Sequence, residues 1–148
     1  MNDLPSSVLF ACTMNSIRSP IAEGILKFFH GHKIYVDSVG VNVSEIDEFA
    51  VVVMEEIGID LSQHRGKNFD DLEDDFYDLV ISLSPEAHHR AVELTRVMSV
   101  ELEYWKTLDP SFIISDTREE RLDSYRQVRD QLMEMIKNRF PTVSAYDT

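Results

Sequence analysis

Cysteine is nearly absent from this chain: Cys12 is the only one among 148 residues. A single thiol excludes an internal disulfide and every zinc site built on several cysteines. Disulfide-free chains are typical of reducing compartments, so we expect a cytoplasmic protein. The adjacent His88 and His89 point about 100° apart on a helix, and the acidic run 70–78 lacks the spacing of a calcium loop. We therefore expect no metal and no cofactor.

Long apolar runs and positive charge are also scarce. No stretch approaches the roughly 20 apolar residues of a membrane helix. The first residues, "MNDLPSSVLF", lack a basic segment followed by an apolar run, so we expect no signal peptide. Lys and Arg number 14 against 27 Asp and Glu, which gives a formal net charge of −13. Nucleic acids and anionic membranes are polyanions, so we expect neither as a partner. A small phosphate ligand stays compatible, because the field of a site can oppose the global one.

The chain shows no internal repeat and no low-complexity linker. Its 148 residues suit one domain, so we expect a single domain over residues 1–148. The composition, 43% hydrophobic and 28% charged, is ordinary for a globular protein.

Short apolar segments alternate with amphipathic ones along the chain. The apolar segments predict strands at 7–12, 33–40, 78–83 and 97–105. Helices are predicted from Ser19-Pro20 onward, over 46–58, over 86–96 after Ser84-Pro85, and over 117–140. Inward faces are predicted for Ile21, Ile25, Phe28 and Phe29, for Ile46, Phe49, Ala50, Val53, Met54 and Ile57, and for Leu122, Tyr125, Val128, Leu132, Met135 and Ile136. This alternation predicts βαβ units and a parallel sheet.

The segment "CTMNSIRSP" joins the first predicted strand to the first predicted helix. Parallel sheets bind ligands at the carboxyl ends of their strands. A loop there directs backbone N–H groups and the helix dipole at an anion, and Arg18 adds a fork that binds two phosphate oxygens. The same positive potential favours the thiolate of Cys12. The alternative is a buried cysteine at a strand end and a surface arginine.

Three further polar residues have two interpretations each. Asn15 either provides a left-handed conformation inside the loop or is an ordinary turn residue. Ser19 caps the helix, hydrogen-bonds the sulfur and helps it leave again, or does both. Asp109 of "TLDPSF" lies in a loop after the fourth predicted strand, which can overhang the same sheet edge. In one interpretation, Asp109 is the general acid that protonates the leaving oxygen when phosphate is transferred to a cysteine sulfur. In the other, it is part of a simple Asp-Pro turn.

The stretch "VLFACTMNSIRSPIAE" resembles the signature of the low-molecular-weight protein tyrosine phosphatases and of the thioredoxin-coupled arsenate reductases that share their fold. The similarity continues through "VDSVG", "GIDLSQHRGKNF", "DLVISLS" and "DP". The resemblance implies an α/β fold of three layers: a twisted four-stranded parallel sheet, helices on both faces, and a phosphate-binding loop after the first strand.

The resemblance also implies roles for individual residues. Cys12 would be the nucleophile, Arg18 the clamp on the phosphate and the transition state, and Asp109 the general acid and then the general base. The phosphate-binding loop would comprise Thr13, Met14, Asn15, Ser16, Ile17 and Arg18. A supporting polar network would comprise Ser19, Ser38 and His64.

The chain departs from the family in ways that bear on substrate. A relay through three cysteines is impossible with one thiol, and Ser84 stands where a second cysteine is expected. Met14 and Ile17 replace the glycine and second cysteine typical of the phosphatases. "DPSF" has one ring, Phe112, where an aromatic pair is usual. Ser16 resembles the small hydroxyl residue of a branch that removes phosphate from arginine.

We therefore predict a phosphomonoester hydrolase, a protein tyrosine phosphatase that acts through a phosphocysteine intermediate. Its substrate would be a phosphorylated protein or a small aryl phosphate. The alternatives are a protein arginine phosphatase and a non-catalytic phosphate-binding module of the same fold. The sequence predicts neither the physiological substrate nor the oligomeric state.

Overall fold

The computed structural model describes residues 4–72, 77–113 and 115–141, so part of the acidic run, 73–76, lies outside the described residues. Four strands form one sheet: β1 (Ser7–Cys12), β2 (Tyr35–Gly40), β3 (Leu79–Ser82) and β4 (Glu101–Tyr104). Four α-helices accompany them: α1 (Arg18–His30), α2 (Glu48–Glu55), α3 (Pro85–Leu94) and α4 (Arg118–Arg139). Two 3-10 turns, η1 (Phe69–Asp71) and η2 (Pro110–Phe112), complete the elements. None of the described helices is both long enough and apolar enough to span a bilayer.

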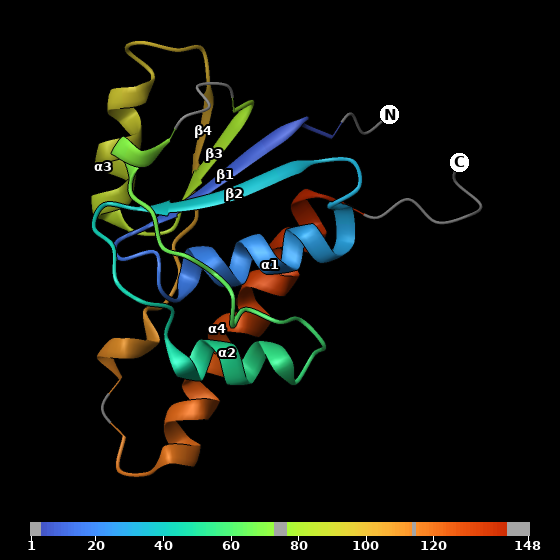
Figure 1. The fold of residues 1–148 in the computed structure, drawn as a ribbon, viewed down its shortest axis with the longest axis vertical. Helices are drawn as coiled ribbons and strands as arrows, with labels where there is room; N and C mark the ends of the chain where they lie inside the picture. The colour runs from blue at the N-terminus through green and yellow to red at the C-terminus, as the bar shows by residue number, and fades with distance from the viewer. Residues whose placement is uncertain (1–3, 73–76, 114, 142–148) are drawn as a thin grey trace, which may run out of the picture.

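All strand pairs are parallel, and the strand order is β2-β1-β3-β4. The last residues of the strands lie in register, because Cys12 pairs with Gly40 and Ala11 pairs with Ser82. The carboxyl ends of the strands, drawn as arrowheads, therefore meet at one edge of the sheet (Figure 1). The loop after β1 lies at this edge.

Helices cover both faces of the sheet, which confirms the predicted three layers. The larger core packs alternate strand residues such as Phe10 and Ile81 against α1, α2 and α4. The smaller core packs the intervening residues, such as Leu9 and Val80, against α3. Figure 1 shows α3 on one side of the sheet and the other three helices on the opposite side.

Side-chain caps fix the starts of three helices. Ser84 accepts a hydrogen bond from Ala87 N at the start of α3, and Thr117 accepts one from Glu120 N at the start of α4. Asp47 caps α2, so this helix begins at Glu48 and not at the predicted residue 46. A capping side chain satisfies an otherwise unpaired amide, which is why these polar residues set the boundaries.

The start of α1 and part of its buried face differ from the prediction. The helix begins at Arg18, so Ser19 lies inside it, and no side chain caps it. The predicted inward position of Phe28 is wrong, since this ring is 63% exposed. Ile21 and Ile25 are fully buried, as predicted. The buried stripe also includes Ala22 and Leu26, which moves its centre away from Phe28 and leaves that ring at the margin.

Candidate active site

The loop between β1 and α1 turns its carbonyl groups outward. The carbonyl oxygens of Cys12, Thr13, Met14 and Ser16 accept hydrogen bonds from the backbone of residues 41–47. In contrast, the backbone N–H groups of residues 13–17 donate to no other group among the described parts of the chain. A loop whose carbonyls are used and whose N–H groups are unused leaves a set of donors available to an anion, as an anion-binding nest requires.

Asn15 holds the shape of this loop. Its φ of 53° is the only positive φ of a non-glycine residue in the described chain. Asparagine tolerates this left-handed region better than most residues. Its side chain is fully buried and saturated, donating from Nδ2 to Ser19 Oγ (2.8 Å) and Ser38 Oγ (3.0 Å). Its Oδ1 accepts from Lys67 N (3.0 Å) and contacts His64 Nε2 (3.1 Å).

Ser19 faces the sulfur from inside α1. Its Oγ lies 2.9 Å from Cys12 Sγ and 3.4 Å from Val39 O. Because Ser19 Oγ accepts from Asn15 Nδ2, its own proton is available, and the sulfur is the nearer acceptor. Of the two interpretations of Ser19, the helix cap is therefore wrong, and the contact with the sulfur is observed.

A second layer of polar groups lies behind Asn15. Ser38 Oγ donates to Glu23 Oε1, and His64 Nδ1 lies 3.8 Å from the same carboxylate oxygen. Burial lowers the pKa of His64 from its ordinary value of 6.5, although the negative charge of Glu23 opposes this shift. A neutral His64 donates from Nε2 to Asn15 Oδ1, which leaves Nδ1 without a proton.

The guanidinium of Arg18 is fixed at the end of β3. It is 7% exposed, and its Nη1 donates to Leu83 O at 2.8 Å. The same carbonyl accepts from Thr107 Oγ1 at 3.1 Å. Leu83 O thereby links the arginine of the first loop to the segment that carries Asp109. Of the alternative interpretation, the buried cysteine at the strand end is observed, since Cys12 is 3% exposed, whereas the surface location of Arg18 is wrong.

Asp109 lies beside this guanidinium. Its Oδ2 is 3.5 Å from Arg18 Nη2, and its side chain is 19% exposed. Its other oxygen, Oδ1, accepts from Ser111 N (3.0 Å) and Ser111 Oγ (2.7 Å). Ser111 therefore orients the carboxyl group so that one oxygen faces the loop and the other faces away.

Four residues that the sequence analysis singled out around the loop differ in their exposure. Met14 (38% exposed) belongs to the loop itself, and Phe112 (82% exposed) follows Asp109 by three residues. Thr13 Oγ1 donates to Ser84 Oγ at 3.0 Å, so the serine at the expected place of a second cysteine is in contact with the loop. Ile17 is buried within the larger core. Phe112, the one ring of "DPSF", is therefore exposed.

Sequence reasoning missed two residues of this arrangement, Glu23 and Thr107. A signal existed for Glu23, because it follows Ser19 by four positions and so lies on the same face of α1. No comparable signal existed for Thr107, since its contact with a backbone carbonyl depends on the path of the segment after β4. No group of three or more His, Cys, Asp or Glu in the described ranges is arranged to hold a metal ion.

Fold and site together define an α/β protein in which a loop with unused N–H groups joins a cysteine at the end of the first strand to an arginine at the start of the first helix. The comparisons with known proteins agree. A family model described as "Low molecular weight phosphotyrosine protein phosphatase" matches residues 7–146. The chain therefore belongs to the low-molecular-weight phosphotyrosine protein phosphatase family.

Some of the similar proteins are named arsenate reductases and others protein tyrosine phosphatases. A glutaredoxin arsenate reductase of Synechocystis sp. is 34% identical over 137 residues, 93% of this chain and 98% of that protein. An arsenate reductase solved in its phosphate-binding state is 32% identical, with a TM-score of 0.69, over 89% of this chain and 94% of that one. A low-molecular-weight protein tyrosine phosphatase from T. tengcongensis is 27% identical, with a TM-score of 0.72, over 88% and 95%.

Proposed function

We propose that this protein is a cysteine-dependent phosphomonoester hydrolase that acts as a protein tyrosine phosphatase. The observation that supports it best is the loop of unused N–H groups at residues 13–17, with the Cys12 sulfur at one end and the Arg18 guanidinium at the other. Such a loop matches the three outer oxygens of a phosphoryl group. Asp109, 3.5 Å from Arg18, supplies a carboxyl group at the side where a leaving group would depart.

In the first step the Cys12 thiolate attacks phosphorus. The S–P bond forms while the P–O bond to the substrate breaks, and Asp109 gives its proton to the leaving oxygen. Arg18 binds two of the outer oxygens in a bidentate manner and balances the charge that spreads over them.

In the second step water attacks phosphorus and gives a proton to Asp109. The S–P bond breaks, inorganic phosphate leaves, and the sulfur departs as a thiolate. The Ser19 hydroxyl, 2.9 Å away, donates a hydrogen bond to that developing charge. Asp109 is then protonated again and ready for another cycle.

Two features bear on the choice of substrate. The exposed ring of Phe112 beside Asp109 favours an aromatic leaving group such as tyrosine. Ser16, buried within the loop, is the feature that favours phosphoarginine as the alternative. A competition panel of phosphotyrosyl, phosphoarginyl and phosphoseryl peptides against one aryl phosphate ranks these substrates directly.

Arsenate reduction is a second candidate, because relatives with that name cover most of the chain. Reduction of arsenate to arsenite needs two electrons, and one sulfur of the chain cannot supply them alone. Cys12 would form a thioester with arsenate, an external thiol would attack the Cys12 sulfur, and the S–As electron pair would pass to arsenic. The products would be arsenite and a mixed disulfide on Cys12. Arsenite formation in the presence of a small thiol such as glutathione tests this route.

The phosphatase proposal is tested with aryl phosphates that differ in leaving-group pKa. We expect Cys12→Ser to lower kcat by about 10³-fold or more on all of them. We expect Asp109→Asn to lower kcat by about 10²- to 10⁴-fold on poor leaving groups and far less on good ones. Asp116→Asn, in the same segment, is the matched control. Equal losses by Asp109→Asn on good and poor leaving groups would refute the general acid, and turnover by Cys12→Ser would refute the nucleophile.

A further inference from the structure

Two arginines of α4 share one aromatic ring. The guanidinium carbon of Arg121 lies 4.5 Å from the centroid of the Phe49 ring, and that of Arg118 lies 5.1 Å from it. Both side chains are exposed, and neither guanidinium has an ion pair or a hydrogen bond within residues 4–72, 77–113 and 115–141. Two like charges held on one ring repel each other, and an anion between them would relieve that repulsion.

Acidic neighbours among the described residues form no ion pair with these two arginines and contact other groups instead. Glu119 pairs with Arg126 at 2.8 Å, and Glu120 Oε2 accepts a hydrogen bond from Asp116 N at 3.2 Å. On α2's side, Asp47 accepts a hydrogen bond from the Tyr125 hydroxyl at 2.9 Å. Because no carboxylate of the described residues forms an ion pair with Arg118 or Arg121, both guanidinium groups can contact a ligand.

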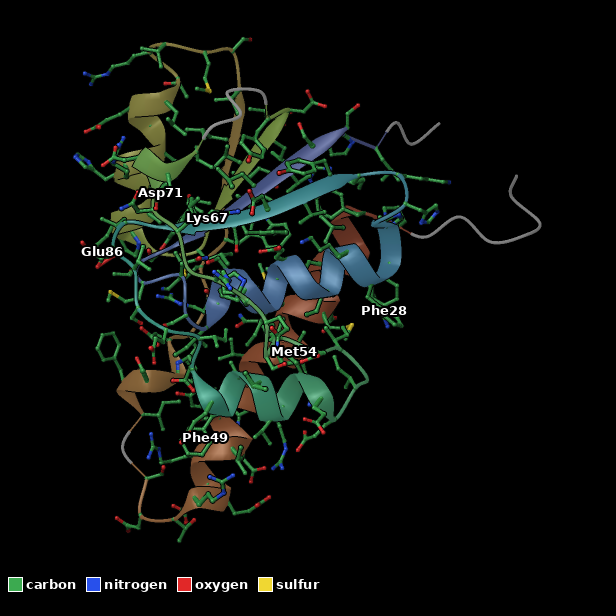
Figure 2. All side chains as sticks on the ribbon, in the orientation of Figure 1. Phe28, Phe49, Met54, Lys67, Asp71 and Glu86 are labelled. Carbon is green, nitrogen blue, oxygen red and sulfur yellow. The ribbon has the colours of Figure 1, made fainter. Side chains whose placement is uncertain are left out.

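The Phe49 ring, which the two arginines share, is linked by side-chain contacts to the loop between β1 and α1. The Phe49 ring packs against the Tyr125 ring at 5.4 Å between centroids, where α2 meets α4 (Figure 2). The hydroxyl of Tyr125 donates to Asp47, and Asp47 N donates to Ser16 O of the loop at 3.0 Å. The chain of contacts from the arginine pair to the loop thus runs through three side chains.

The helix that carries the arginine pair packs against the turn that follows the candidate general acid. Helix α4 packs on η2 (Pro110–Phe112), which directly follows Asp109. Burial raises the pKa of Tyr125 most, followed by Asp47; Asp109 raises it further, while Arg121 lowers it. Asp109 and Arg121 therefore both lie within electrostatic reach of one hydroxyl group.

We propose that Arg118 and Arg121 form a second anion subsite, which binds an acidic group of the substrate next to the phosphoryl group held by the loop. This inference rests on the proposed function and names the substrate class: a phosphorylated peptide with a carboxylate or a second phosphoryl group near the phosphorylated residue. Guanidinium groups suit either anion, because their planar fork binds two oxygens at once.

The test compares two phosphotyrosyl peptides that differ only in whether Glu or Gln flanks the phosphotyrosine, with a small aryl phosphate as the third substrate. At low salt we expect the wild-type protein to prefer the Glu peptide by about tenfold in kcat/KM, chiefly through KM. We expect the double variant Arg118→Gln, Arg121→Gln to lose this preference and to hydrolyse the aryl phosphate as the wild-type protein does. The double Lys variant keeps part of the preference, since it keeps the charge and loses the fork.

Arg96→Gln is the matched control, because Arg96 lies in the turn after α3 and its guanidinium forms no ion pair with the described residues. It must leave the preference unchanged. The absence of a preference in the wild-type protein, or an equal loss on the aryl phosphate in the Gln variant, would overturn the subsite. A doubly phosphorylated peptide distinguishes the two anions, since the better of the two substrates identifies the group that the pair accepts.

Failure of the proposed function has a different signature. If no substrate is hydrolysed, the same peptides are titrated against Cys12→Ser by equilibrium binding. A preference for the Glu peptide that disappears in the Gln variant would support the subsite without catalysis. Equal binding of both peptides would refute it.

Discussion

At the scale of single residues, His64 gives the site a dependence on pH. Burial holds its pKa below the ordinary 6.5, and the charges of Lys67 and Lys27 act in the same direction, against Glu23. As pH falls below about 6.5, the unfolded chain takes up a proton at this position before the folded chain does. The contribution of His64 to stability is therefore present above that pH and is lost as pH falls toward the folded pKa.

We predict that His64→Gln is less sensitive to acid than the wild-type protein. The free energy of unfolding, measured with urea between about pH 8 and pH 5, should fall more in the wild-type protein than in the variant. The exposed His89, changed to Gln, serves as the control and should follow the wild-type protein. Parallel pH profiles for wild type and His64→Gln would contradict the assigned sign.

The positions of some site residues could be predicted from the sequence, and those of others could not. Cys12 and Arg18 could be predicted, because a strand, a loop and a helix start in one short segment restrict where their side chains point. Asp109 required the resemblance, since nothing local places residue 109 next to residue 18. Ser111 was noticed only as a missing aromatic, and its hydrogen bonds to Asp109 follow from the η2 turn that the sequence did not predict.

At the scale of elements, the loop depends on how closely the end of β2 approaches it. A Cβ atom on Gly40 would lie 2.7 Å from Asn15 N and 2.8 Å from the carbonyl carbon of Met14. Both are backbone atoms, so neither can rotate away as a flexible side chain would. Gly40→Ala would therefore push β2 and the loop apart.

We predict that Gly40→Ala lowers kcat/KM on an aryl phosphate by about tenfold or more and destabilises the fold by about 1–3 kcal/mol. Gly58→Ala is the matched control: Gly58 has a φ of +81° but no heavy atom within 4 Å of its Cβ position. The control should lose about 1–2 kcal/mol through backbone strain alone and keep its activity. The pair is compared by steady-state kinetics and urea unfolding, and full activity in Gly40→Ala would refute the close approach as a requirement.

Element types were predictable here, and their ends were less so. Ser84 followed by proline set the start of α3 correctly, because the capping chemistry is local. The predicted strand 97–105 is shorter, Glu101–Tyr104, since pairing with β3 determines where β4 begins. The start of α2 was misplaced because Ile46, an apolar residue, continues the helical spacing before the Asp47 cap.

At the scale of the whole molecule, the alternation of strands and helices predicted a parallel sheet but not the order of its strands. That order places β1 between β2 and β3, so the loop after β1 receives Ser38 from one neighbour and Leu83 O from the other. A loop after an edge strand would have contacts on one side only. The central position of β1 therefore explains why the polar network around Asn15 is held from the β2 side and the Arg18 guanidinium from the β3 side.

The net charge of −13 is the last property of the whole molecule with a measurable consequence. Carboxylates that repel each other destabilise the compact state, whereas exposed ion pairs such as Arg126 with Asp123 contribute little each.

This repulsion can be tested with salt. Raising NaCl from about 10 mM to about 150 mM shortens the Debye length from about 30 Å to about 8 Å and screens the repulsion. We predict that Tm rises, by about 2–4 °C for each kcal/mol gained. Chloride is used because sulfate would bind the loop and stabilise by mass action. A constant Tm would show that attraction within the ion pairs balances the repulsion, and a falling Tm that it outweighs the repulsion; either result would show that the excess of acids does not limit stability.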